Sequence, residues 1–103
     1  MPKINFELPV PVNNKTAFKK IKDFFKGDND IKRFDAKASC TFDEDHSICH
    51  LKGSQFSAKI QTTEINADKT NVNVEIDIPL SLVLFKGKIK ELVEKNIKKV
   101  FKT

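Results

Sequence analysis

The stretch VNVEIDIPLSLVLFKGKIKELVEKNIKKVFK, residues 72–102, decides the fold of this chain. Apolar and polar residues alternate from Val72 to Ile78, which is typical of a strand with one buried face. Pro79 ends that strand because it has no N–H for a sheet, and it suits the first turn of a helix. From Leu82 onward apolar residues recur at helical spacing, which predicts one long helix with a lysine-rich back. Its 22 residues would span roughly 33 Å, and Gly87 indicates close packing or a kink.

The rest of the chain predicts a second helix and several further strands. The alternating segment 4–10 contains one proline and precedes another, which favours a strand at a sheet edge. Asn13 or Asn14 can cap a helix that ends at Gly27. Its apolar face consists of Ala17, Phe18, Ile21, Phe24 and Phe25. Period-two alternation predicts further strands over 38–42, 49–51 and 56–62.

The element order β-α-β-β-β-β-α indicates the α+β class. Because the alternation is one-sided, the strands are expected to be antiparallel, with one face open to water. We therefore expect a single domain over 1–103, a length that suits one modest core. Its curved antiparallel sheet of four or five strands packs against a long C-terminal amphipathic helix and a shorter N-terminal helix.

The composition is that of an ordinary soluble protein, with 32% charged and 39% hydrophobic residues. There is neither an apolar run of membrane-spanning length nor the pattern of a signal peptide, so we expect a cytoplasmic protein without a membrane span. The nine phenylalanines, with no tyrosine or tryptophan, favour an apolar core or an apolar surface over a polar ligand site.

The two cysteines lie on either side of a predicted hairpin loop over 43–46. With that loop, Cys40 falls opposite Cys49, and Ala38 falls opposite Leu51, close enough for a cross-strand disulfide. In a reducing cytoplasm we expect free thiols that pack as small core residues instead.

The potential catalytic and metal-binding residues do not form a coherent site. Cys49 and His50 are adjacent strand residues and point to opposite faces, while His46 lies in the loop. This excludes a Cys–His pair and argues against a zinc site. The acidic run over 43–45 lacks the glycine and the spaced oxygen ligands of a calcium loop. We expect no enzyme, no metal and no cofactor.

The excess positive charge is confined to the C-terminal helix. Residues 86–102 hold seven lysines and two glutamates, which accounts for the formal net charge of +5 of the whole chain. With one arginine and no tyrosine or tryptophan, nucleic acid is not the expected partner. A nonspecific polyanion or nucleic-acid binder that acts through the lysine-rich helix remains a further alternative to the two functional hypotheses given below.

The segment Leu80–Phe85 has five apolar residues out of six, more than one buried helical stripe absorbs. Leu84 or Val83 is expected to stay exposed or to meet a partner, unless the strand edge or the first helix covers the segment. Apolar residues beside lysines fit a subunit contact or an interfacial surface. The candidate interaction surface is Leu80, Val83, Leu84, Phe85, Lys86, Lys88 and Lys90.

Several short segments resemble proteins of the polyhydroxyalkanoic acid system, which are encoded near polyester-granule functions. These are the opening MPKI, the helix that carries Ala17, the pairs TF at 41–42 and EK at 94–95, KGS at 52–54, VEIDIPL at 74–80 and LFKGKIK at 84–90. The resemblance implies a bacterial cytoplasmic protein without an established catalytic site. The element order is also distantly similar to a shortened helix-grip fold, as in START and Bet v 1-like proteins, which hold apolar ligands between the sheet and a long C-terminal helix.

Two functional hypotheses follow. The first is a small non-catalytic accessory or binding protein associated with polyhydroxyalkanoate granules, with a partner protein or with itself. The alternative is a carrier of a small apolar ligand in a helix-grip-like cavity, and a cavity of several hundred Å3 would favour it. The candidate cavity lining is Phe42, Phe56, Ile60, Val74, Ile76, Ile89 and Val93.

Overall fold

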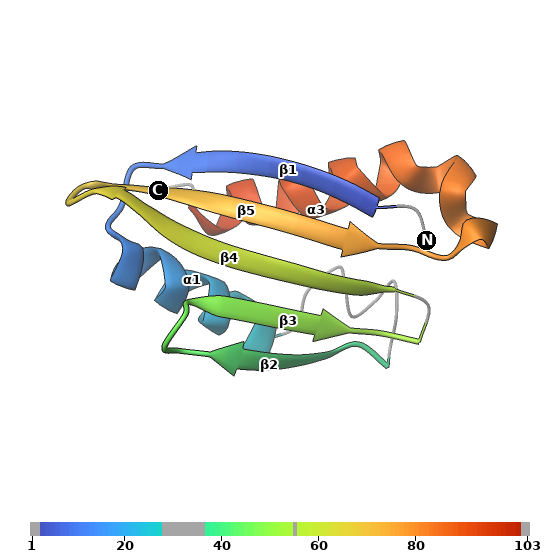
Figure 1. Ribbon diagram of the computed structural model, residues 1–103, viewed down its shortest axis with the longest axis horizontal. Helices are drawn as coiled ribbons and strands as arrows, with labels where there is room; N and C mark the ends of the chain where they lie inside the picture. Colours follow the sequence, from blue (N-terminus) through green and yellow to red (C-terminus); the bar gives the residue numbers. More distant parts are fainter. Residues whose placement is uncertain (1–2, 28–36, 55, 102–103) are drawn as a thin grey trace.

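The computed structural model describes residues 3–27, 37–54 and 56–101. It contains one five-stranded antiparallel sheet with strand order β1-β5-β4-β3-β2 (Figure 1). The strands are β1 (Lys3–Val10), β2 (Ser39–Asp43), β3 (Ile48–Lys52), β4 (Ser57–Asn66) and β5 (Lys69–Asp77). The helices are α1 (Asn14–Lys26), the 3-10 helix η1 (Leu80–Phe85) and α3 (Lys86–Val100). The α+β class, the antiparallel sheet and the element order are confirmed.

Both long helices cover the same face of the sheet, α1 behind the β2–β4 side and α3 behind the β1–β5 side (Figure 1). The alternation explains this arrangement, since Val72, Val74 and Ile76 of β5 are buried while the residues between them face outward. Within the described sheet β1 pairs with β5 alone, so its proline lies at the predicted edge. The Asn13 side chain caps α1 by accepting a hydrogen bond from the Thr16 N–H at 2.8 Å.

The long C-terminal helix is confirmed, but its expected start at Leu82 is wrong. The Leu82 N–H donates to the Pro79 carbonyl oxygen at 3.0 Å, which closes a 3-10 turn, and the α-helix begins only at Lys86. The reason is directional. α3 has to run back across the sheet against the direction of β5, so the chain must reverse after Pro79 (Figure 1). The 15 residues of α3 span about 22 Å. Gly87 follows this break, and close packing does not explain it because an added Cβ would meet nothing within 4 Å.

The predicted register of the β2–β3 hairpin is also wrong. Cys49 pairs with Phe42 and Cys40 pairs with Leu51, so the two cysteines share a face without being opposite each other. The connecting residues are 44–47 rather than 43–46, because the Asp43 carboxylate accepts the His46 N–H at 3.2 Å and shapes the turn. Neither cysteine forms a disulfide, and burial raises the pKa of the Cys49 thiol to about 12.

Candidate functional site

An apolar cleft lies between the sheet and the η1–α3 segment. Its floor is one cross-strand row, in which Leu51 of β3 pairs with Ala58 of β4 and Ala58 pairs with Ile76 of β5. Ala58 is the small member of that row, so the sheet surface is lowest between two large side chains. The nine described residues that line the cleft are all apolar: Leu51, Phe56, Ala58, Ile76, Ile78, Leu82, Ile89, Leu92 and Val93.

The free volume of the cleft is about 20 Å3, which is close to the space of one water molecule. An apolar lining offers such a water no hydrogen-bond partner, so a cavity of this kind stays dry. In the neighbouring inward row, Cys49–Ile60–Val74, the central residue is an isoleucine that is 1% exposed, so a large side chain occupies the place that corresponds to Ala58. The position of the cleft therefore follows from the alanine at position 58.

Four of the seven predicted cavity residues line this cleft: Phe56, Ile76, Ile89 and Val93. Ile60 and Val74 are buried one row away, in the closed part of the core. Phe42 lies against α1 instead, where its ring meets Phe18 edge-on at 6.5 Å between centroids. The five lining residues that sequence reasoning missed are Leu51, Ala58, Ile78, Leu82 and Leu92. Their inward phase was visible in the sequence, but their common position depends on strand order and register.

The residues of the predicted interaction surface lie together at the η1 turn and the start of α3. The exposed fractions are 91% for Leu84, 75% for Leu80, 51% for Phe85 and 41% for Val83. We call these four residues the η1 patch. Neither the strand edge nor α1 covers the patch. Leu82 is the residue of this turn that faces the cleft. Lys86, Lys88 and Lys90 are exposed beside the patch.

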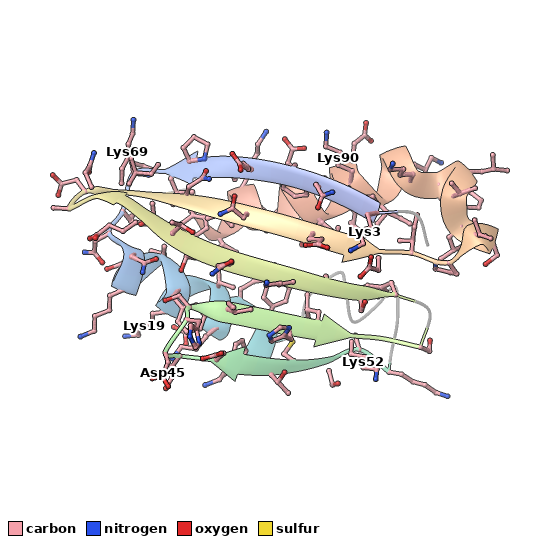
Figure 2. All side chains as sticks on the ribbon, in the orientation of Figure 1. Lys3, Lys19, Asp45, Lys52, Lys69 and Lys90 are labelled. Atoms are coloured by element: carbon pink, nitrogen blue, oxygen red, sulfur yellow. The ribbon has the colours of Figure 1, made fainter. Side chains whose placement is uncertain are left out.

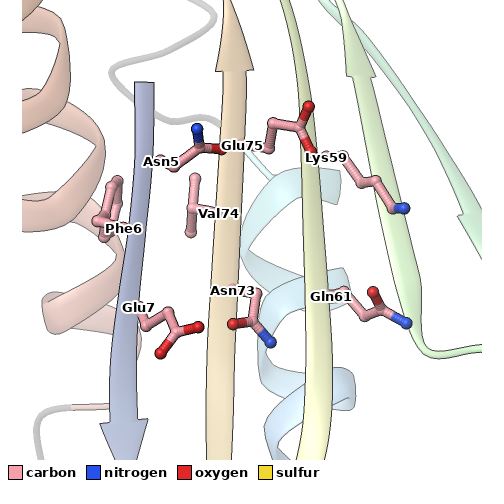
Figure 3. A pocket seen from close by; sticks show the side chains of 8 residues that line it. All are labelled: Asn5, Phe6, Glu7, Lys59, Gln61, Asn73, Val74 and Glu75. Atoms are coloured by element: carbon pink, nitrogen blue, oxygen red, sulfur yellow. The ribbon is translucent and has the colours of Figure 1, made fainter. Parts of the chain in front are cut away.

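The opposite face of the sheet is polar and open (Figures 2 and 3). A shallow depression of about 260 Å3 lies over β1, β5 and β4, with Asn5, Glu7, Lys59, Gln61, Asn73 and Glu75 around it. Nearby, Lys3 donates to Glu75 at 2.8 Å and lies 3.7 Å from Asp77. The hydrogen bond from Lys3 holds the pKa of Glu75 below its ordinary value. These are exposed pairs on a solvated surface, and they do not enclose a ligand.

Among the described residues, the histidines and the buried cysteine lie on different parts of the β2–β3 hairpin. His46 Nδ1 lies 2.9 Å from an Asp43 oxygen in the β2–β3 loop, and this hydrogen bond lowers the pKa of Asp43. His50 is exposed, whereas Cys49 is buried on the other face of β3. Within the described residues no three His, Cys, Asp or Glu side chains come together as a metal ligand group. The described helices also include none with the length and apolar character needed to cross a bilayer.

The comparisons with known proteins give structural likeness only. No family model and no curated protein sequence matches the chain. The solved di-domain aromatase/cyclase BexL, from the BE-7585A biosynthetic pathway, superposes with a TM-score of 0.71 at 8% identity; the match covers 98% of this chain and 45% of that one. The Zhui aromatase/cyclase from Streptomyces sp. R1128 has a TM-score of 0.66 at 7% identity, over 97% and 91% of the two chains. A START superfamily protein from Mycobacterium smegmatis has a TM-score of 0.62 at 12% identity, over 96% of each.

These matches show that the chain shares its fold with the aromatase/cyclases and the START superfamily protein, the fold-level similarity that the element order indicated. The likeness extends over nearly the whole chain, although at 7–12% identity it shows the fold alone. The resemblance to proteins of the polyhydroxyalkanoic acid system gains no support, because no family model matches.

Proposed function

We propose that this protein is a non-catalytic carrier of a small apolar molecule, held between the sheet and the η1–α3 segment. The observation that carries the proposal is the cleft over Ala58, where all nine described lining residues are apolar. The fold supports the proposal. Helix-grip proteins hold apolar ligands between the sheet and the C-terminal helix, and the cleft of this protein lies at the same place. This was the alternative hypothesis from the sequence, and the fold favours it over granule association.

A ligand must widen this cleft, because about 20 Å3 is far below the roughly 300 Å3 of a small ligand pocket. The wall that can move is η1 with the first turn of α3. Leu82 is only half-buried, and Gly87 has no neighbour that would contact a Cβ. The other end of α3 is held more firmly, since Ile97 is fully buried and Asn96 is 3% exposed. Ligand entry through the η1 end therefore disturbs the least packing.

The lining also supports a carrier rather than an enzyme. None of the nine described lining residues has a group that can move a proton, attack a carbon atom or stabilise a developing charge. The buried thiol of Cys49 does not supply a nucleophile, because its pKa of about 12 keeps it protonated at neutral pH. A molecule in the cleft would be held by apolar contact alone.

Binding of the neutral fluorophore N-phenyl-1-naphthylamine tests the proposal. We expect saturable fluorescence enhancement that the substitution Ala58→Leu abolishes, because the larger side chain fills the floor of the cleft. Leu84→Ser is the matched control, since Leu84 is 91% exposed and outside the cleft. Circular dichroism melts establish that both variants remain folded. Enhancement that survives Ala58→Leu and disappears in Leu84→Ser would place the dye on the surface and contradict the carrier.

A second candidate is association with polyester granules or another apolar surface, as first expected from the sequence. The exposure of the four residues of the η1 patch favours it. Co-sedimentation of the purified protein with polyhydroxyalkanoate granules tests this candidate, and Leu84→Ser should leave the protein in the supernatant.

A further inference from the structure

The η1 patch is the largest concentration of exposed apolar side chains in the described part of the chain. The described part of the chain has five exposed large hydrophobic residues, and four of them belong to the patch. The fifth, Ile65, lies in the β4–β5 hairpin at the other end of the molecule, while η1 projects beyond the sheet at the end of the long axis (Figure 1). The patch is therefore a protruding apolar tip, a shape suited to insertion into an apolar surface.

The charges beside this tip have one sign. Residues 79–90 contain three lysines and no acidic residue. Lys86, Lys88 and Lys90 are exposed, and within the described residues none of them forms an ion pair, whereas Lys98 further along α3 pairs with Glu94 at 3.2 Å. The lysines nearest the patch are thus available to an external anionic surface.

This combination selects one kind of partner. A second copy of the chain, packed patch to patch about a two-fold axis, would bring the lysines of both copies together without a compensating carboxylate. A neutral apolar surface would bury the leucines but leave the lysines without counter-charges. An anionic lipid surface uses both features, because leucines enter the acyl boundary while lysines remain among the phosphates.

We propose that the η1 patch and Lys86, Lys88 and Lys90 dock this protein onto an anionic lipid bilayer. Leu80 and Leu84, the two most exposed residues of the patch, are the side chains that enter the acyl boundary. The docking side chains are not part of the cleft lining, because Leu80 and Leu84 lie outside the cleft and Leu82 alone of η1 lines it.

Vesicle sedimentation of the full chain tests the docking. We expect the protein to pellet with vesicles of 70% phosphatidylcholine and 30% phosphatidylserine, and to stay in the supernatant with phosphatidylcholine alone (the percentages are roughly those of an anionic leaflet). Raising the salt to about 0.5 M should weaken the binding, since the screening length falls well below 10 Å.

Two sets of variants separate the apolar and the charged parts. Leu84→Ser should lower the partition coefficient roughly tenfold or more, because a leucine no longer leaves water. Ile65→Ser is the matched control, an exposed aliphatic residue at the far end of the molecule, and should leave binding unchanged. Replacing Lys86, Lys88 and Lys90 together by glutamine should cost roughly fivefold for each lysine. The same change at Lys95, Lys98 and Lys99 alters the net charge equally on the same helix, and it should cost much less.

Three results would overturn the proposal. The first is a failure of the wild-type protein to pellet with anionic vesicles at low salt. The second is equal binding to neutral vesicles or polyester granules that the Lys86/Lys88/Lys90 triple variant does not weaken, which would assign the patch to a neutral apolar surface. The third is a dimer in light scattering that Leu84→Ser converts to a monomer, which would assign it to a second copy. None of these measurements reports on the cleft. The carrier proposal can therefore fail in dye binding while the docking proposal holds, and the docking proposal can fail while the carrier proposal holds.

Discussion

Truncation of Ile97 is expected to remove a large part of the stability of the domain. Ile97 is 0% exposed on α3 and belongs to the single core that the sheet shares with both helices. Ile97→Ala removes three carbon atoms from that core, which costs about 2.4 kcal/mol in transfer free energy alone. The unfilled cavity adds to this, so we expect a loss of about 3–4 kcal/mol in the free energy of unfolding. A domain of this size has only about 5–15 kcal/mol in total.

Urea denaturation followed by far-ultraviolet circular dichroism measures this loss, since the chain has no tryptophan or tyrosine for a fluorescence assay. The midpoint should fall with little change in slope, which indicates lost stability rather than a different unfolded state. Leu84→Ala is the matched control, because it truncates an aliphatic side chain that is 91% exposed and should cost within about 0.5 kcal/mol. Equal losses for the two variants, or a loss below about 1 kcal/mol for Ile97→Ala, would refute the assignment of the buried face of α3.

Three further outcomes follow from particular contacts. Asn13→Ala should lower the free energy of unfolding by about 1 kcal/mol in the same urea assay, because the Thr16 N–H loses its capping acceptor; Asn13→Asp should retain most of it. Because the Cys49 thiol ionises near 9 when unfolded and at about 12 when folded, the folded state binds more protons between these values and stability should decline as pH rises above about 9. Cys49→Val should lose that part of the decline, and an unchanged pH profile would contradict the burial. Gly87→Ala should raise stability by about 0.5–1 kcal/mol, because Gly87 is helical and an added Cβ meets no neighbour; a lower melting temperature would show that the glycine is structurally required.

The sequence predicted which face of each strand is buried more securely than it predicted which residues meet. The β2–β3 hairpin illustrates the difference. Pairing Cys40 with Cys49 and pairing Cys40 with Leu51 differ by two residues, and both keep the same side chains inward. Alternation therefore cannot distinguish the two registers. The turn distinguishes them, through hydrogen bonds from the backbone and the ring of His46 to the Asp43 carboxylate.

The start of the C-terminal helix was mispredicted for a different reason. Five of the six residues 80–85 are apolar, so the segment has no polar side whose spacing could separate an α-helix from a 3-10 turn. The sheet decides where the α-helix begins, because α3 covers the core only if the chain reverses after β5. The excess of apolar residues left two outcomes open: Leu84 or Val83 exposed or in contact with a partner, or the segment covered by the strand edge or the first helix. Both residues are exposed, since a buried stripe holds only part of such a run.

The cleft could be anticipated only in part, and the missing information is which inward residues share a row. Leu51, Ala58 and Ile76 are separated along the chain, and only the pairing of β3 with β4 and of β4 with β5 brings them into one line. Among the buried inward residues of β3, β4 and β5 that lie under the helices, alanine is the smallest side chain, and its position decides where the core has a gap. A small residue in the inward phase of a central strand is therefore the signal that sequence reasoning could have used. It is also why Ala58→Leu is the sharpest single substitution for the carrier: it changes the floor of the cleft and leaves both the η1 patch and the lysines of α3 as they are.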